Sequence, residues 1–442
     1  MPESIIGSVA DSWTVTSLAN ICNEGGGGIQ TGPFGSQLHA SDYVTHGIPS
    51  VMPQNIGDNK IIETGIARIS IEDAGRLSRY LLESGDIVYS RRGDVERRAL
   101  VRENENGWLC GTGCLRVRPG KGINSRFLSY YLGHPGVREW IVRHAVGATM
   151  PNLNTKILGA LPVAAPADKE QVAIGVALGA LDDKIESNRS ISETASNLAD
   201  SQLILALVEI RDILLPLLRG DLDSTHAAGD WEVLTLHEAC SRGGGDIQTG
   251  PFGSQLHASD YAVSGVPVVM PKDIGANIFV SDSVARISKN TAARLSRHRL
   301  QEGDVVYARR GDVERRALVR ADNAGWLCGT GCLRVRPGRV VDKYFLAYYF
   351  GHPEVRNWVV RHAIGATMPN LNTAILGALP VVLPPASLRL TLANRLAALD
   401  EILVHAVRQN QILIELRDAL LPKLMSGEIR VRDAEKIVED VT

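Results

Sequence analysis

The chain consists of two copies of one sequence unit. Residues 13–182 recur at a constant offset of 218, so that Trp13 aligns with Trp231 and Asp182 with Asp400. Four blocks are letter-identical in the two copies: IQTGPFGSQLHASDY at 29–43 and 247–261, RRGDVERRALVR at 91–102 and 309–320, GWLCGTGCLRVRPG at 107–120 and 325–338, and GATMPNLNT at 147–155 and 365–373. Because a tandem duplication repeats one folding unit, we expect two similar halves.

The register of the repeat changes near its end. Beyond Asp400 the match returns at an offset of 206, where RDILLPLL (211–218) aligns with RDALLPKL (417–424). The segment after the first copy is therefore twelve residues longer than its counterpart, and the extra residues fall between 183 and 208. They lengthen a helix or form a bulge at its end.

Length and composition limit the class of protein. At about 100–200 residues per domain, a chain of this length makes two to four domains. No apolar run approaches the roughly 18 residues of a membrane span, and the N-terminal sequence lacks the basic start and apolar stretch of a secretory signal. Six cysteines in 442 residues are too few for a disulfide scaffold. We therefore expect a cytoplasmic protein with reduced thiols.

Each copy has two parts with different patterns. The first part, about 13–165, is rich in glycine, proline and short β-type runs such as GDIVYS, and it predicts an α+β domain in which the sheet dominates. The second part carries apolar residues at alternating steps of four and three, which is typical of a helix that packs on another helix. The other long helix is the expected partner, and the alternative is that each helix packs on its own domain. These apolar residues are Ile174, Leu178, Leu181, Ile185, Leu203, Leu207, Ile210, Leu214 and Leu217, then Leu392, Leu396, Leu399, Leu403, Leu413, Leu416 and Leu420.

Positive charge is concentrated in the domains. Residues 29–163 hold 16 Lys and Arg against 12 Asp and Glu, and residues 247–381 hold 17 against 10, which leaves a net charge of −13 on the rest of the chain. Only 10 of the 47 basic residues are lysine. The arginine fork pairs bidentately with phosphate or with the guanine edge, so this distribution favours nucleic-acid contact by the domains.

The first identical block surrounds Phe34 with Gly32, Pro33 and Gly35, which predicts a turn. Its polar neighbours carry groups that hydrogen-bond to base edges or phosphates. The alternative is a structural turn anchored by a buried Phe34. We predict DNA contact by Gln30, Thr31, Ser36, Gln37 and His39, and by Gln248, Thr249, Ser254, Gln255 and His257 in the second copy.

The second block, RRGDVERR, places four arginines around a turn at Gly93 and Asp94. These arginines are candidates for phosphate contact, although at least two of them could be internal ion-pair partners, and the whole block could be a solvated hairpin. The candidates are Arg91, Arg92, Arg97 and Arg98, with Arg309, Arg310, Arg315 and Arg316 in the second copy.

The block GATMPNLNT combines amide side chains with a glycine and a proline. Asn pairs bidentately with adenine, but Asn and Thr before a helix are equally ordinary turn and cap residues. The candidates are Thr149, Asn152 and Asn154, with Thr367, Asn370 and Asn372 in the second copy.

Signals of metal binding and catalysis are weak in this sequence. Cys110 and Cys114 have C-x₃-C spacing, but no second His or Cys pair follows at metal-site spacing, so we predict no metal. His144 lies in an expected helix, where a packed or solvent-facing His is the ordinary interpretation. The sequence contains no P-loop, H-E-x-x-H, G-x-S-x-G or dinucleotide fingerprint, and GDVER lacks the lysine that a metal-dependent nuclease places after its acidic pair. We predict no catalytic residues.

Several segments resemble the specificity (S) subunits of type I restriction-modification systems. PADKEQVAIGVALGALDDKIESNR (166–189) and LIELRDALLPKLMSGEIRV (413–431) are similar to their helical spacers. GPFGSQLHASDY, GWLCGTGCLRVRP, YYLGHPGVREW and GATMPNLNTKILGALPV resemble one class of their target-recognition domains. Two features depart from the family. Its two domains are commonly dissimilar, whereas these are near copies, and the second helix has SLRLTLANR in place of the segment with Glu170 and Gln171.

The resemblance implies an α+β fold with two mixed α/β target-recognition domains. They would be related by a pseudo-twofold axis and joined by two long antiparallel, coiled-coil helices. The expected limits are 1–165 for the first recognition domain, 166–220 for the central helix, 221–384 for the second domain, 385–425 for the C-terminal helix and 426–442 for a tail.

The resemblance also implies a non-catalytic subunit that reads a bipartite, palindromic DNA target. Two methyltransferase subunits carrying S-adenosylmethionine would dock on its helices, and a nuclease or translocase subunit that uses ATP and Mg²⁺ would join them. The alternatives are a reader subunit of another phage-defence or modification complex and a DNA-cleaving hydrolase.

Overall fold

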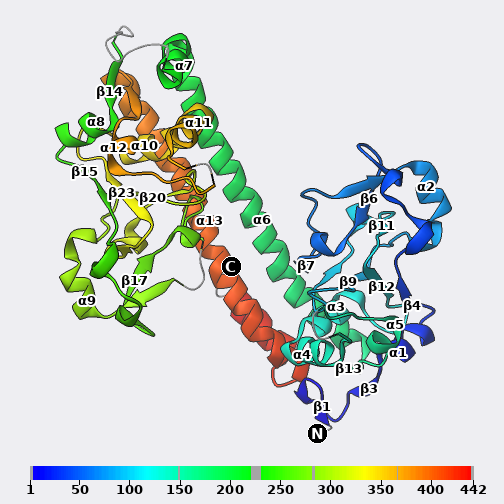
Figure 1. Cartoon of the computed structure of the whole chain (residues 1–442). Coiled ribbons are helices and arrows are strands. Elements are labelled where there is room, and N and C mark those ends of the chain that lie inside the picture. The colour runs from blue at the N-terminus through cyan, green and yellow to red at the C-terminus, as the bar shows by residue number, and fades with distance from the viewer. Residues whose placement is uncertain (1–2, 148–149, 221–229, 281–283, 366, 440–442) are drawn as a thin grey trace. The chain divides into compact units, whose positions relative to one another are not determined.

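The computed structural model describes residues 3–147, 150–220, 230–280, 284–365 and 367–439. These residues form two compact units. The first unit contains residues up to Asn188 and those from Arg408 onward, and the second contains Arg189–Val407. Each unit therefore holds one copy of the domain and a part of each long helix (Figure 1). Within the described ranges, no helix is both long and apolar enough to cross a membrane.

The domain of the first unit is built on two mixed sheets. The five-stranded sheet has the order β4-β12-β9-β10-β7 and is antiparallel except for the pair β10 and β7. The four-stranded sheet has the order β11-β6-β8-β5, and only β11 and β6 are parallel. Antiparallel β1 and β2 form a hairpin, and antiparallel β3 and β13 form a further pair. The strands are β1 (Glu3–Ser4), β2 (Gly7–Ser8), β3 (Thr14–Ser17), β4 (Gly28–Thr31), β5 (Tyr43–Val44), β6 (Ile48–Val51), β7 (Asp58–Asn59), β8 (Ala67–Ile69), β9 (Ile87–Ser90), β10 (Arg98–Leu100), β11 (Leu109–Cys110), β12 (Cys114–Arg118) and β13 (Pro162–Ala165).

Strand β9 explains why GDIVYS reads as a continuous apolar run. Ile87 and Tyr89 belong to the large core cluster of the unit, whereas Val88 belongs to a second cluster that includes Cys110 and Cys114. Because successive side chains of a strand point to opposite faces, β9 is buried on both sides.

Short helices cover the large core. They are α1 (Leu18–Glu24), α3 (Ser125–Gly133), α4 (Pro135–His144) and α5 (Thr155–Gly159). A further short helix, α2 (Ile71–Arg76), places Ala74 in a smaller separate cluster with Ile69 and Leu109. Side-chain caps begin several of them, because Ser17, Asn124 and Asn154 accept hydrogen bonds from amides of their first turns.

The second unit repeats this topology. Its sheets have the orders β15-β23-β20-β21-β18 and β16-β19-β17-β22, and β14 pairs with β24. The strands are β14 (Glu232–Thr235), β15 (Asp246–Thr249), β16 (Tyr261–Ala262), β17 (Val266–Val269), β18 (Ala276–Asn277), β19 (Ala285–Ile287), β20 (Val305–Ala308), β21 (Arg316–Leu318), β22 (Leu327–Cys328), β23 (Cys332–Arg336) and β24 (Pro380–Leu383). The helices are α8 (Leu236–Arg242), α9 (Lys289–Arg294), α10 (Lys343–Tyr349), α11 (Pro353–His362) and α12 (Thr373–Gly377). The predicted duplication of a mixed α/β domain is confirmed.

The two long helices are α6 (Asp168–Leu207) and α13 (Ala386–Ser426). Within the first unit, Ile174, Leu178 and Ile185 of α6 share one buried cluster with Leu413 and Leu420 of α13 and with the domain. The apolar residues at alternating steps of four and three were expected to pack either on the other long helix or on their own domain. Both interpretations are partly correct, because each helix packs on the domain and on the other helix.

Polar contacts give the direction of the helices in the first unit. Asn188 donates to Gln409 at 2.8 Å, and Arg417 pairs with Asp182 at 2.9 Å. The residue number falls along α13 as it rises along α6, so the two segments are antiparallel. In the second unit, Arg395 of α13 donates to Gln202 of α6 at 3.1 Å.

The longer first spacer is not one continuous helix. Helix α6 ends at Leu207, a 3₁₀ turn (Val208–Ile210) follows, and RDILLPLL forms a separate helix α7 (Arg211–Arg219). The matching RDALLPKL lies inside α13. Leu214 and Leu217 of α7 share a core with Trp358 of α11, as Leu420 shares one with Ile141 of α4. The break thus allows an equivalent apolar segment to pack on the second domain.

A short helix α14 (Val431–Glu439) follows α13. Its Ala434 is fully buried in the core of the first unit.

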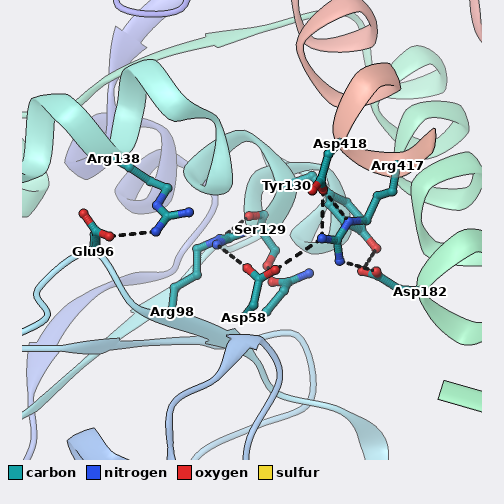
Figure 2. A network of polar contacts seen from close by, with 10 residues as sticks. Asp58, Glu96, Arg98, Ser129, Tyr130, Arg138, Asp182, Arg417 and Asp418 are labelled. Atoms are coloured by element: carbon teal, nitrogen blue, oxygen red, sulfur yellow. Dashed lines mark hydrogen bonds and ion pairs between the residues drawn. The ribbon is translucent and has the colours of Figure 1, made fainter. Parts of the chain in front are cut away.

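Figure 2 shows how the C-terminal part of α13 is held in the first unit. Asp182 accepts from Arg417 at 2.9 Å and from the Tyr130 hydroxyl at 2.6 Å. In the second unit the equivalent Asp400 instead accepts from Arg320 of its own domain, at 2.6 and 2.8 Å. One acidic position is therefore neutralised by a different arginine in each copy.

The sequence departure at the start of the second long helix also has a structural explanation. Gln171 donates to the Pro166 carbonyl at 2.9 Å, and Arg389, which stands at its place in the second copy, donates to the Pro384 carbonyl at 3.0 Å. The two side chains hold the same backbone position in their units.

Candidate nucleic-acid interface

The four identical blocks meet along one edge of the first domain. The Gly32 amide donates to the Cys114 carbonyl at 2.9 Å, and the Arg91 amide donates to the Gly113 carbonyl at 2.8 Å. The Gly93 amide in turn donates to the Pro151 carbonyl at 3.1 Å. A Cβ at Gly32 would lie 2.1 Å from the Gly111 carbonyl oxygen, so this approach requires glycine.

The second domain makes the same contacts. The Gly250, Arg309 and Gly311 amides donate to the carbonyls of Cys332, Gly331 and Pro369 at 3.0, 2.7 and 3.2 Å. The sequence identity of the four blocks therefore corresponds to one continuous loop surface in each unit, which we call the loop edge.

Gln37, a predicted DNA contact, supports its own turn. Its Oε1 accepts from the Phe34 amide at 3.3 Å and from the Tyr80 hydroxyl at 2.8 Å. Its carbonyl accepts from Arg76 at 2.8 Å. The alternative of a turn anchored by a buried Phe34 is wrong, because 57% of Phe34 is exposed. In this turn the amide faces inward and the aromatic ring faces outward.

The second copy lacks part of this support. His298 stands where the first copy has Tyr80, and Gln255 Oε1 is buried without a hydrogen bond from a described residue. His298 Nε2 accepts from Arg297 Nε at 3.0 Å. Burial and the neighbouring Arg297 charge hold the pKa of His298 below its ordinary value.

Two of the eight predicted arginines are internal. Arg98 is 5% exposed and donates to the Ser129 carbonyl at 2.7 Å, and burial lowers its pKa (Figure 2). Arg316 is 7% exposed and donates to the Ala347 carbonyl at 3.2 Å. A phosphate cannot reach guanidinium groups buried in this way, so the prediction of DNA contact is corrected for these two residues.

The other arginines of the block lie nearer the surface. Arg92 and Arg310 are exposed, and no ion pair holds either side chain among the described residues. Arg97 and Arg315 are exposed and pair with Asp94 and Asp312 at 3.0 and 2.9 Å. Arg91 and Arg309 are half-buried, and Arg309 donates to Asn370 and to the Leu371 carbonyl. The loop edge thus presents Arg92 and Arg310 as its open cations.

Gln30 and Thr31 are half-buried in β4, and Gln30 accepts from Arg116 at 2.6 Å. Gln248 and Thr249 are half-buried in β15, where Arg334 pairs with Asp246 instead. His39 and His257 are exposed at the start of 3₁₀ turns.

The residues of the block GATMPNLNT have different roles in the structure. Asn154 and Asn372 cap α5 and α12, accepting from the amides of Ile157 and Ile375 at 2.8 Å each. Asn152 and Asn370 are half-buried bridge partners of Arg92 and Arg310. Thr367 is exposed. The predictions for Thr149 and for the side chains of Ser36 and Ser254 lie outside the described residues.

The cysteine and histidine candidates belong to the packing. Cys110 and Cys114 are buried, and burial raises the pKa of the Cys110 thiol to about 12. His144 stacks on Trp140 with ring centroids 4.0 Å apart. Within the described residues, no group of three His, Cys, Asp or Glu side chains is placed to hold a metal ion.

The chain belongs by its fold to the proteins that combine two copies of a mixed α/β domain with two long helices. Each domain packs on a part of these helices and exposes one loop edge. Residues 40–196 match the family described as the type I restriction modification DNA specificity domain.

Relatives extend this match over nearly the whole chain. The MjaIX type I restriction enzyme specificity subunit of Methanocaldococcus jannaschii is 21% identical over 98% of this chain and 96% of its own length. The putative MjaX specificity subunit of the same organism is 22% identical over 97% of this chain and 96% of its own length. The crystal structure of the type I restriction-modification S subunit from M. genitalium has a TM-score of 0.60 at 15% identity, and the match covers 95% of this chain and 98% of that one. The chain is thus similar over nearly its whole length to specificity subunits of type I restriction-modification systems, and residues 40–196 match the model of their DNA specificity domain.

Proposed function

We propose that this chain is the DNA-recognition and scaffold subunit of a type I restriction-modification complex. The observation that carries the proposal is the pair of loop edges, in which four separate sequence blocks meet and expose Arg92 and Arg310. Such cations neutralise DNA phosphates. The similarity to specificity subunits supports the same function, and we retain the domain limits given above. We assign no catalytic residue and no cofactor to this chain.

The proposed target is a bipartite, palindromic sequence. Near-identical domains read near-identical half-sites, and the pseudo-twofold relation predicted from the family would place these on opposite strands. The domains differ between 44 and 82, as in Gln54 against Lys272 and Tyr80 against His298, so a single-base asymmetry is compatible with this proposal.

Methyltransferase subunits are the proposed partners of the helices. On the part of α6 in the second unit, Ile191, Leu198 and Leu205 are 43%, 49% and 64% exposed, and their spacing of seven puts them on one helix face. Val172 and Val176 are about half exposed on the part in the first unit. An apolar stripe of this kind fits a protein partner. In the proposed complex, S-adenosylmethionine binds to the methyltransferase subunits, and ATP with Mg²⁺ binds to a nuclease subunit.

Sequencing of methylated bases in a host that carries the operon tests the recognition function. We expect one interrupted motif with inverted half-sites, and its loss when this chain is deleted. Two unrelated half-sites would contradict the palindrome, and unchanged methylation without the chain would contradict the function itself.

Substitution of the exposed cations tests the loop edge. Alanine at both Arg92 and Arg310 is expected to weaken binding to specific and random duplexes alike and to reduce the slope of log K against log salt by about one per lost phosphate contact. Alanine at Arg143, an exposed arginine on α4, is the matched control. An unchanged salt slope in the double variant would exclude these cations as phosphate contacts.

Partner docking is tested by Leu198→Glu and Leu205→Glu. We expect loss of co-purification with the methyltransferase encoded beside this chain. Ile71→Lys, at an apolar position of α2 that is 79% exposed and not on the long helices, is the control and should co-purify normally. Wild-type co-purification by the α6 variants would refute docking on this face.

A further inference from the structure

Phe34 and Phe252 project from the loop edges. Each residue is 57% exposed. Each is followed by a glycine of positive φ, Gly35 at +60° and Gly253 at +59°, with open space where a Cβ would stand. The turn therefore presents an aromatic ring to solvent beside a backbone that carries no side chain.

The turn in the first unit is held rigidly from behind. The Tyr80 hydroxyl and the Phe34 amide both bind Gln37 Oε1, and Arg76 binds the Gln37 carbonyl. In the second unit, Arg294 binds the Gln255 carbonyl at 2.9 Å. Gln37 and Gln255 are half-buried behind their turns, so Phe34 and Phe252 are the large apolar side chains that these turns leave exposed to a partner.

The exposed aromatic residue is retained in both copies. Exposed apolar residues in the neighbouring segment have changed since the duplication: Ile71, 79% exposed, corresponds to Lys289, and Val44, 40% exposed, corresponds to Ala262. Phe34 and Phe252 are identical and equally exposed. Core packing does not explain this, because more than half of the surface of each residue is exposed.

A methionine adds a second exposed apolar group in each unit. Met150 is 62% exposed and Met368 is 64% exposed. Pro151, the residue after Met150, accepts from the Gly93 amide of the arginine turn through its carbonyl. Exposed Phe and Met side chains on the same loop edge as the open cation Arg92 are the combination with which proteins both hold a phosphate backbone and wedge open a base step.

We propose that Phe34 and Phe252 each insert their ring at one base-pair step of a half-site and partly unstack it. This inference rests on the proposed DNA-recognition function and deepens it. The aromatic ring replaces part of the lost base stacking, and Arg92 or Arg310 holds the adjacent backbone. The kinked step then contributes to specificity through its ease of deformation, in addition to any hydrogen bond to a base edge.

The experiment begins with selection of duplexes from a random pool by the full chain in complex with its methyltransferase. The selected consensus is then synthesised with 2-aminopurine, a base that fluoresces more strongly when unstacked, at each position in turn. We expect wild-type complex to raise the fluorescence at one step in each half-site. Because an inverted repeat binds in either orientation, Phe34→Ala and Phe252→Ala should each remove about half of the rise at both half-sites, and the double variant should abolish it. Affinity for the consensus should fall about 5- to 100-fold in each case.

The variants provide their own controls. Phe34→Leu should lose less of the fluorescence rise than Phe34→Ala, because an apolar wedge remains, whereas Phe34→Ser should lose as much. Ile71→Lys introduces the residue of the other copy and should match wild type. An unchanged thermal unfolding temperature for Phe34→Ala, expected for an exposed ring, assigns its binding loss to the interface.

The two possible failures are distinguishable. If wild type selects a consensus but Phe34→Ala and Phe252→Ala keep its fluorescence and affinity, the wedge is refuted and the recognition function stands. If wild type selects no consensus from the pool, the recognition function itself is refuted, and the wedge with it.

Discussion

Replacement of Arg417 by methionine tests how the end of α13 is held in the first unit. Arg417 contacts Asp182 at 2.9 Å, Asp58 at 3.3 Å and Asp418 at 2.8 Å, and its side chain is 16% exposed. Methionine keeps the length and apolar stem of the side chain but removes the charge. The Asp182 carboxylate would then keep only the Tyr130 hydroxyl from the pair of donors that it has in Figure 2.

The exposure of each carboxylate determines how much stability the loss of its contact with Arg417 costs. Removing one partner of a fully buried ion pair costs about 3–5 kcal/mol. The Asp182 side chain is 17% exposed and keeps its bond to Tyr130, so we expect about 2–3 kcal/mol from this contact. Asp58 and Asp418 are 63% and 58% exposed, and their contacts contribute less than about 1 kcal/mol each.

Hydrogen exchange measured by mass spectrometry on the full chain locates the effect. Two units need not unfold in one transition, so a single melting temperature would mix them. At about 2–3 kcal/mol, amides around Leu413 and Leu420 should exchange roughly 30- to 150-fold faster in Arg417→Met, if they open by local unfolding. Peptides from the second domain should be unaffected.

Three further variants separate charge from packing. Asp418→Asn, at an exposed partner, should change exchange less than about threefold. Adding Asp182→Asn to Arg417→Met should restore much of the protection, because no unpaired charge remains. Arg320→Met should show the matching loss in the second unit, where Arg320 pairs with Asp400. Exchange in Arg417→Met within threefold of wild type would refute this account of the helix end.

Three other outcomes are expected. His298→Tyr should stabilise the second unit by about 1 kcal/mol at pH 7.5, because the tyrosine hydroxyl gives Gln255 a donor. The gain should be larger at pH 5.5, because the pKa of His298 is depressed in the folded state. The stability that the neutral imidazole contributes to the wild type is complete above the unfolded pKa and is lost as the pH falls through the folded pKa. Calorimetry at the two pH values checks this, and an equal difference at both would contradict it. Asn154→Ala should cost about 1 kcal/mol through the lost cap of α5 without changing sequence preference, as chemical denaturation and duplex selection would report; a changed consensus would make Asn154 a reader. Insertion of one turn in both α6 and α13, about 5 Å in each, should change the gap between half-sites in the methylated motif, and an unchanged gap at full activity would exclude the helices as its ruler.

Sequence alone determined the duplication, the mixed α/β domains and the helical segments. Each depends on local periodicity or on identity between copies. The apolar steps from Ile174 to Ile185 match the buried face of α6. The blocks that form the loop edge were also identified from sequence, because letter identity marks them without regard to their distance along the chain.

Only the tertiary structure decided what individual polar residues do. Gln37 faces Tyr80, which lies 43 positions away, and Arg98 reaches the Ser129 carbonyl, 31 positions away. No local pattern contains such partners, so the same letters Q and R fit an exposed reader or an internal support. The exposed Phe34 was missed for the same reason, although its identity with Phe252 between glycines was a usable signal.

The longer spacer and the shared acidic position also separate what the sequence determined from what tertiary packing decided. Sequence located twelve extra residues between 183 and 208, but tertiary packing decided that the helix ends at Leu207 and that Leu214 packs beside Trp358. Asp182 and Asp400 are the same letter in the repeat, yet one pairs with Arg417 and the other with Arg320. The physical reason is that periodicity and propensity act over one or two turns of chain, whereas burial and pairing of a charge depend on segments that only the folded chain brings together.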